Sequence, residues 1–270
     1  MSPYFRKNFA RGFGTWPLKG AVLDAALGHA IAAGYRAIDT AQMYENEAEV
    51  GRVIANCGIA RDDFLITTKV HPNNYTDADF LPSVEASVRA LGEIDVLLLH
   101  WPPASGDVVG PLKLLEAALQ AGLTKAIGVS NFTASMMKIA RDTVDAPLAT
   151  NQVEFHPLLD QSTLLAASKD CDIPLGAYCA VARGRIFGVP VLEEIAAAHG
   201  KSVAQIALRW ILQKGVSVNA MSTKPGNIAA NYAIVDFELS ADEMARIDTL
   251  GAANDRIVTS DVVPWAPDWD

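Results

Sequence analysis

The sequence predicts an α/β fold: one (β/α)8 (TIM) barrel with its active site at the carboxyl-terminal ends of the strands. Polar residues close successive apolar runs, and Asp39, Lys69 and His100 stand at intervals of 30 and 31 residues. That interval suits one strand, one helix and two short loops. The length of 270 residues, 50% of them hydrophobic, suits one barrel of roughly 250 residues. No linker or low-complexity tract divides residues 1–270, so we expect a single domain.

Eight strands are expected in chain order. The run at 94–99 is apolar at nearly every position, which is typical of a parallel strand covered on both faces. An open doubly wound sheet is the alternative, but the chain has no Gly-x-Gly-x-x-Gly turn after a first strand. The expected strands, the first of them weak, are 12–14, 35–39, 64–69, 94–100, 124–129, 149–154, 173–177 and 216–218.

Helices are expected between the strands. Residues 22–31 and 80–91 carry apolar stripes at helical spacing, and Gly34 and Gly92 can end these helices in the left-handed conformation. Start signals occur at Thr76 with Asp79, at Thr133, and at two capping-box pairs, Ser202 with Gln205 and Ser240 with Glu243, whose helices end before Gly215 and Gly251.

Composition argues against several classes of partner. Twenty-two Lys and Arg against 31 Asp and Glu give a net charge of −9, which disfavours nucleic acid and anionic membranes as partners. No apolar run has the length of a signal peptide or a membrane span. Three cysteines without a Cys-x-x-Cys pair disfavour a disulfide framework or structural zinc. We therefore expect a cytoplasmic protein.

Asp39, Lys69 and Tyr44 form the first group of candidate catalytic residues. A lysine closing an apolar strand must reach solvent or pair with an anion, and Asp39 is the natural anion if their strands are neighbours. A buried ion pair with a purely structural role is the alternative. Tyr44 follows Asp39 by five residues. A nearby ammonium would lower the pKa of its phenol from about 10, as suits an acid near neutral pH.

His100 completes a constellation suited to carbonyl chemistry. At the same mouth it could donate a hydrogen bond to a carbonyl oxygen, although a histidine there is also a common packing residue. No side chain donates hydride, so reduction requires a nicotinamide or flavin cofactor. Ser130, Asn131 and Gln152 could bind a carboxamide and Tyr178 could stack on a ring, or these groups could simply satisfy loop backbone.

Together these motifs, in this order, resemble the aldo-keto reductases along essentially the whole chain. Within that family the chain is most similar to bacterial 2,5-diketo-D-gluconate reductases of the B type, which also reduce methylglyoxal, including the carboxyl-terminal stretches 255–258 and 266–270. The motifs that carry the resemblance are 34–41, Tyr44, Asn46-Glu47, Thr67-Thr68-Lys69, His100-Trp101-Pro102 and Gly128-Val129-Ser130-Asn131-Phe132.

The resemblance implies NADPH-dependent reduction of aldehydes or ketones. It also implies that Asp39, Tyr44, Lys69 and His100 form the catalytic tetrad, with Tyr44 as the proton donor. It also implies a monomer that binds a small carbonyl substrate. Cofactor contacts are expected from the first loop and from later strand ends, at Gly14, Thr15, Ser130, Asn131, Gln152 and Tyr178. The substrate pocket is expected to include Trp16, Trp101 and His71, where many relatives carry tryptophan.

The adenosine end departs from the pattern of many relatives. Met221, Asn227 and Ala230 stand where those relatives carry Lys, Arg and Glu. Lys224 could replace the lost charge, and NADPH is expected, with NADH as the alternative. The contacts expected here are Ser222, Thr223, Lys224, Asn227 and Asn231.

Two other classes of function compete with the reductase. One is a non-catalytic regulatory or structural protein that binds the cofactor on the same barrel. The other is a metal-dependent hydrolase using Asp39, His71 and His100, which lacks a His-x-His motif and would place Lys69 where a metal belongs. We expect no metal.

Overall fold

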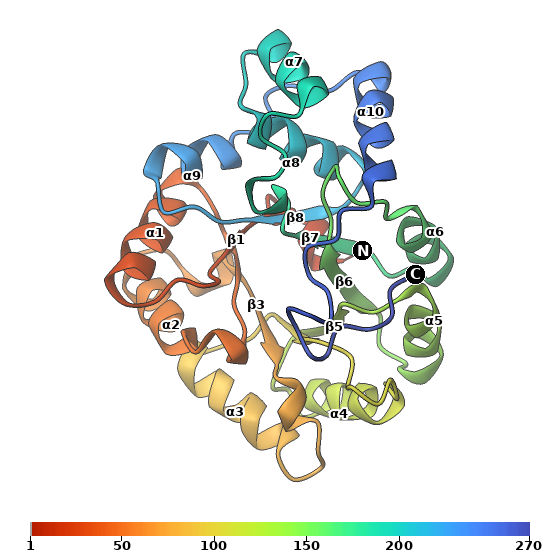
Figure 1. Ribbon diagram of the computed structural model, residues 1–270. Helices are drawn as coiled ribbons and strands as arrows, with labels where there is room; N and C mark the ends of the chain where they lie inside the picture. The colour runs from red at the N-terminus through yellow and green to blue at the C-terminus, as the bar shows by residue number, and fades with distance from the viewer. Residues whose placement is uncertain (1) are drawn as a thin grey trace.

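The computed structural model describes residues 2–270 and forms a closed barrel of eight parallel strands. Each strand pairs with the next in sequence, and β8 pairs with β1 (Figure 1). The predicted barrel is confirmed. The strands are β1 (Arg11–Gly14), β2 (Ala37–Asp39), β3 (Leu65–Val70), β4 (Val96–Leu99), β5 (Ala126–Ser130), β6 (Leu148–Glu154), β7 (Leu175–Tyr178) and β8 (Ser217–Ala220).

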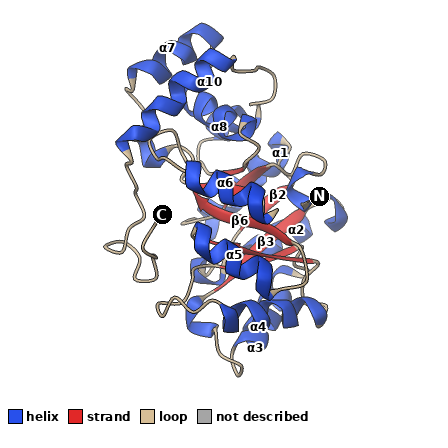
Figure 2. Ribbon diagram, turned by 90° about the vertical axis from the view of Figure 1, so that its right-hand side faces the viewer, coloured by secondary structure: helices blue, strands red, loops and turns tan. Residues whose placement is uncertain are grey.

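Helices surround the barrel as an outer layer (Figure 2). Two of them, α7 and α8, lie between β7 and β8, and two more follow β8. The helices are α1 (Gly20–Ala33), α2 (Glu47–Asn56), α3 (Phe80–Leu91), α4 (Val109–Gln120), α5 (Ala134–Thr143), α6 (Ser162–Cys171), α7 (Pro190–His199), α8 (Val203–Gln213), α9 (Pro225–Tyr232) and α10 (Ala241–Asp248).

The predicted helix ends follow local hydrogen bonding. Gly34 ends α1 with a φ of 110°, and the Ser202 and Ser240 capping boxes are both formed. Thr133 accepts a bond from the first turn of α5. Thr76, by contrast, accepts from the Asp79 amide and so caps the turn before α3 rather than the helix itself.

Strands start later than predicted where a helix end intervenes. The Tyr35 amide donates to Ala30 O and closes α1, so β2 begins at Ala37. Helical structure was predicted to end before Gly251. The helix α10 ends at Asp248, but a 3-10 helix (Thr249–Ala253) follows it and includes Gly251.

The amino end of the barrel is plugged, so chemistry is directed to the other end. Tyr4, in a 3-10 helix (Pro3–Phe5), packs with Phe9 against Leu65 and Leu98, and its hydroxyl lies 2.6 Å from Thr67 Oγ1. The chain termini lie at opposite ends of the barrel (Figure 2). Among residues 2–270, no helix combines the length and apolar composition that crossing a membrane requires.

Candidate active site

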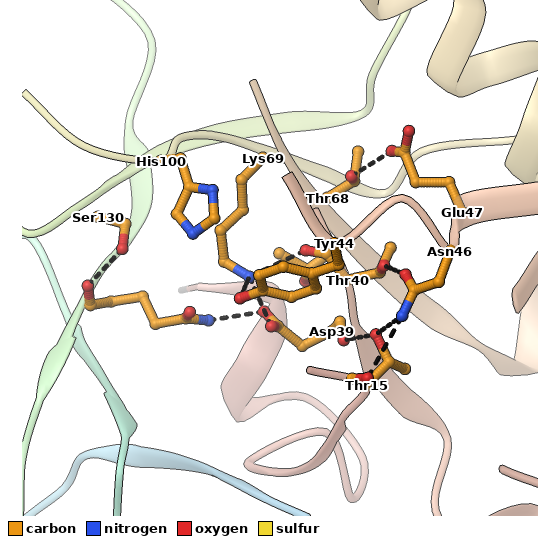
Figure 3. A network of polar contacts seen from close by, with 12 residues as sticks. Thr15, Asp39, Thr40, Tyr44, Asn46, Glu47, Thr68, Lys69, His100 and Ser130 are labelled. Atoms are coloured by element: carbon orange, nitrogen blue, oxygen red, sulfur yellow. Dashed lines mark hydrogen bonds and ion pairs between the residues drawn. The ribbon is translucent and has the colours of Figure 1, made fainter. Parts of the chain in front are cut away.

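Neighbouring strands bring Asp39 and Lys69 together, as their positions predicted. The Lys69 ammonium donates to Asp39 Oδ1 at 2.6 Å and to Thr40 O at 2.9 Å (Figure 3). Lys69 is 1% exposed, so burial of its charge depends on these partners. The pair lies at the carboxyl-terminal ends of β2 and β3.

Tyr44 reaches the same point from a short loop element. A 3-10 helix (Gln42–Tyr44) follows β2 and sets the phenol oxygen 3.2 Å from Lys69 Nζ. The ammonium also lies 4.9 Å from the centre of the Tyr44 ring. A phenol, an ammonium and a carboxylate therefore form one connected group.

Asn46 fixes the loop that carries Tyr44. This buried side chain accepts from Thr40 Oγ1 at 2.6 Å and donates to Leu18 O at 2.9 Å (Figure 3). Thr15 donates to Asp39 O at 3.0 Å and also lies within reach of the Asn46 amide. Hydrogen bonds from Thr15 and to Leu18 thus connect the loop after β1 to the loop after β2.

Protonation states at the site follow from burial and from Lys69. Burial raises the pKa of Tyr44 by more than the Lys69 ammonium lowers it, so the expectation of a lowered pKa is wrong in its net direction. The pKa of Lys69 is raised, because burial, which lowers it, is outweighed by Asp39 and Tyr44. Burial, and then Lys69 and His71, hold the pKa of His100 well below 6.5. The phenol is protonated and the imidazole neutral near pH 7.

His100 follows β4 and faces Tyr44. The two ring centroids lie 5.5 Å apart with the rings nearly perpendicular. Its backbone oxygen accepts from Asn131 Nδ2 at 2.9 Å, while its buried Nδ1 has no hydrogen-bond partner among the described residues.

The predicted carboxamide contacts form one hydrogen-bonded group. Ser130 donates to Gln152 O at 2.7 Å, and Gln152 Nε2 donates across the barrel to Asp39 Oδ2 at 2.7 Å. Tyr178 donates to Asn131 Oδ1 at 2.7 Å, which fixes its ring. The structure thus ties these groups to the tetrad through Asp39.

A cavity of about 400 Å³ opens at this end of the barrel. Its lining includes three residues of the tetrad, namely Asp39, Tyr44 and His100, and the residues expected to bind the carboxamide, namely Ser130, Asn131 and Gln152. Tyr178, Gly14, Trp16 and Trp101 also line it. His71 does not line it: the ring packs against Trp265 at 5.2 Å, and its Nδ1 accepts from the Asn73 amide.

The residues expected at the adenosine end lie around the start of α9. Met221 and Asn231 line the cavity, whereas Ser222, Thr223, Lys224 and Asn227 do not. Lys224 stands immediately before the first turn of α9, and its side chain is exposed. This is the end of a helix at which phosphate groups bind favourably.

These residues fit a nicotinamide dinucleotide. One part of the cavity offers hydroxyl and amide groups beside the flat Tyr178 ring, which suits a carboxamide-bearing ring next to the tetrad. The lining then continues past β8 to Met221, three residues before the exposed cation Lys224, and to Asn231 in the last turn of α9. Within residues 2–270 no cluster of three or more His, Cys, Asp or Glu is arranged to hold a metal ion.

Sequence reasoning missed cavity residues that come from irregular segments. Arg183 lines the cavity with its guanidinium 5.4 Å from the Trp16 ring centre. Val258, Val262 and Val263 line it from the carboxyl-terminal segment. Neither segment has a periodic pattern, although the stretch 255–258 belongs to the family resemblance.

Comparison with protein families decides the assignment. A model described as the aldo/keto reductase family matches residues 12–252. The chain belongs to the aldo/keto reductase family. It is 40% identical over 265 residues to methylglyoxal reductase DkgB of Yersinia pestis, covering 96% of this chain and 98% of that protein. It is 38% identical over 267 residues to the protein of the same name from Escherichia coli O157:H7, covering 97% and 98%.

Solved structures of aldo/keto reductases agree with this assignment. A candidate 2,5-diketo-D-gluconic acid reductase B superposes with a TM-score of 0.92 at 41% identity, covering 97% of this chain and 95% of that chain. A Bombyx mori aldo-keto reductase in complex with NADP gives a TM-score of 0.85 at 30% identity, covering 93% and 92%. The protein is an NADPH-dependent oxidoreductase that reduces carbonyl groups.

Proposed function

We propose that this aldo/keto reductase reduces small aldehydes and ketones with Tyr44 as the proton donor. The observation that carries the proposal is the Tyr44 hydroxyl, which lines the cavity 3.2 Å from a buried ammonium. Because the pKa of the phenol is raised, the phenol holds its proton until an alkoxide develops on the substrate.

Lys69 and Asp39 make that proton transferable. As Tyr44 gives up its proton, the adjacent ammonium stabilises the phenolate that forms. Asp39 holds Lys69 charged in a buried setting and fixes its direction towards the phenol. Gln152 in turn occupies the second Asp39 oxygen, which leaves the carboxylate one orientation.

His100 orients the substrate rather than supplying the proton. Its neutral imidazole at the cavity surface can donate a hydrogen bond to the carbonyl oxygen and hold that oxygen beside Tyr44. When bound, the reduced nicotinamide supplies the hydride. Ser130, Asn131 and Gln152 would hold its carboxamide, and Tyr178 would stack on its ring.

The Tyr44→Phe variant tests the proton donor. It removes the acidic hydroxyl and keeps the ring, so methylglyoxal turnover should fall by about 10²–10⁴-fold. NADPH affinity, measured by fluorescence titration, should be little changed. Tyr75→Phe is the matched control, because Tyr75 is a partly buried tyrosine that does not itself line the cavity and whose hydroxyl donates to Trp101 O. Robust turnover by Tyr44→Phe would contradict the assigned role.

The substrate class follows from the size of the cavity and from the relatives. About 400 Å³ must hold the reactive end of the cofactor and the substrate together. Relatives at 38–40% identity are named methylglyoxal reductases. The protein should therefore show a higher kcat/KM for methylglyoxal than for a bulky polycyclic ketone, and the reverse order in steady-state assays would refute the assigned class.

Lys224 supports a preference for NADPH over NADH. It is an exposed cation at the start of α9, where the chain lacks the Lys and Arg of many relatives. Lys224→Ala should lower the ratio of kcat/KM values for NADPH and NADH by about three- to tenfold. Lys113→Ala, an exposed lysine on α4, should leave that ratio unchanged. An unchanged ratio in Lys224→Ala would remove the residue from the cofactor site.

The working form of the protein is a cytoplasmic monomer, with residues 1–270 as one domain and no nucleic-acid or membrane partner. Support comes from three unpaired thiols, Cys57, Cys171 and Cys179, and from the net charge of −9. Analytical ultracentrifugation should give a single species near 28.8 kDa.

A further inference from the structure

The carboxyl-terminal segment 255–270 forms a wall of the active-site cavity. It runs from α10 across the carboxyl ends of the strands (Figure 1). Three of its side chains, Val258, Val262 and Val263, line the cavity. The segment has no helix or strand of its own, so the position of this wall depends on what holds it.

Glu154, the last residue of β6, holds the start of this segment. Its Oε1 accepts from the Ile257 amide at 2.7 Å and its Oε2 accepts from the Val258 amide at 2.9 Å. His156 Nε2 lies 2.8 Å from Oε1. Glu154 and His156 are both fully buried. Two consecutive backbone amides thus converge on one carboxylate more than a hundred residues away in the sequence.

The alternation of β6 explains how the carboxylate reaches this place. Side chains two residues apart share one face of a strand. Gln152 points into the barrel and bonds Asp39, so Glu154 points inward one layer nearer the mouth. Burial alone would raise the pKa of Glu154, but its hydrogen bonds to His156, Ile257 and Val258 outweigh burial and lower it. The side chain therefore remains a carboxylate, which accepts two amides more strongly than a neutral group would.

The segment has further attachments at both ends. At its start the Asp255 amide donates to Leu158 O at 2.8 Å, and the Asp255 carboxylate pairs with the exposed Arg185. At its far end Asp270 Oδ2 accepts from the Ala134 amide at the start of α5 at 2.6 Å. The Arg256 guanidinium lies 4.1 Å from the centre of the Trp269 ring, and Trp269 packs on Trp101 of the cavity lining. The Glu154 attachment is the one that is both fully buried and adjacent to a cavity residue.

We propose that Glu154 is a positioning residue that holds Val258 and the segment behind it as a wall of the substrate cavity, and thereby sets the affinity for the carbonyl substrate. Glu154 does not line the cavity. The hydrogen bonds of its side chain go to His156 and to the Ile257 and Val258 amides, and not to a residue of the tetrad. It acts through the backbone of 257–258. The kinetic part of this inference rests on the proposed carbonyl reduction, and its structural part does not.

Glu154→Gln is the decisive variant. An amide can offer only one acceptor, so its NH2 group would face one of the two backbone amides and the attachment would be lost. Trypsin should then cut after Arg256 about tenfold faster than in wild type, releasing residues 257–270, which mass spectrometry identifies. KM for methylglyoxal should rise about tenfold, while kcat and the Kd for NADPH change little.

Asp95→Asn serves as the matched control, because Asp95 is a buried carboxylate that accepts from the Ile66 amide at the amino-terminal side of β4. It should lower stability without changing KM or cleavage after Arg256. Unchanged cleavage and KM in Glu154→Gln would overturn the inference, as would equal changes in Asp95→Asn.

A second variant is available if Glu154→Gln does not fold. Glu154→Asp keeps the charge but shortens the side chain, so it should show faster cleavage and a higher KM, both to a smaller extent. No change in Glu154→Asp would equally overturn the inference. If wild type lacks turnover, the proposed function fails, and trypsin cleavage still decides whether Glu154 holds the segment.

Discussion

At the scale of single residues, the site holds three ionisable groups in defined states. The Tyr44 phenol keeps its proton because burial raises its pKa, Lys69 stays charged because Asp39 and Tyr44 surround it, and burial keeps His100 neutral. An acid that retains its proton at neutral pH is ready to donate whenever negative charge develops beside it.

These states predict the pH dependence of reduction. Because the pKa of His100 lies well below 6.5 and that of Tyr44 lies above 10, kcat should show no bend near pH 6.5. It should decline only as pH rises through the pKa of the phenol, since the donor then loses its proton. Steady-state kcat measured across this pH range is the check. A bend near pH 6.5 that disappears in His100→Gln would show that His100 titrates during the reaction.

Residue identities were predictable where spacing carried them. The repeated interval between Asp39, Lys69 and His100 predicted their convergence, because parallel strands of one barrel end at the same mouth. The net direction of the Tyr44 shift was not predictable, since it depends on a burial that no sequence position reveals. The position of His71 was not predictable either, because its ring packs against Trp265, which is distant in the sequence, and does not line the cavity.

At the scale of elements, regular patterns were readable and short irregular ones were not. Strand-like runs predicted seven strands clearly and the first one, near 12–14, only weakly, and polar caps predicted the starts of α5, α8 and α10. The 3-10 helix that presents Tyr44 has three residues, too few for any periodic pattern. The segment 255–270 has no periodic pattern either, and its path depends on distant partners, Glu154 for Ile257 and Val258 and the Ala134 amide for Asp270.

Alanine substitutions at two helical glycines should change stability in opposite directions. A Cβ on Gly51 of α2 would stand 2.1 Å from Ala90 O of α3, so Gly51→Ala should destabilise by about 1–3 kcal/mol. Gly28 of α1 faces open space, and Gly28→Ala should stabilise by about 0.5–1 kcal/mol. Urea unfolding of the two variants measures both effects. Equal effects of one sign would mean that α2 and α3 are not packed as closely as described.

At the scale of the whole molecule, the cavity lies at one end of the barrel because the other end is filled. Tyr4 and Phe9 fill the amino end, and the cavity lining gathers residues from β1 to the segment after α10. Such a site exists only when the barrel is closed, because its residues come from strands that meet nowhere else in the chain. Cofactor binding must therefore stabilise the whole fold.

This linkage gives a prediction about thermal unfolding. NADPH at a hundred times its Kd should raise the unfolding free energy by about 2.7 kcal/mol. For a domain of this size the unfolding temperature should rise by about 5–10 °C, as measured by scanning calorimetry. Tyr44→Phe should keep this rise, since it removes a proton donor and not a cofactor contact, whereas Lys224→Ala should reduce the rise at the same NADPH concentration and leave that with NADH unchanged. A wild-type protein whose unfolding temperature NADPH does not change would have no dinucleotide site in the barrel mouth.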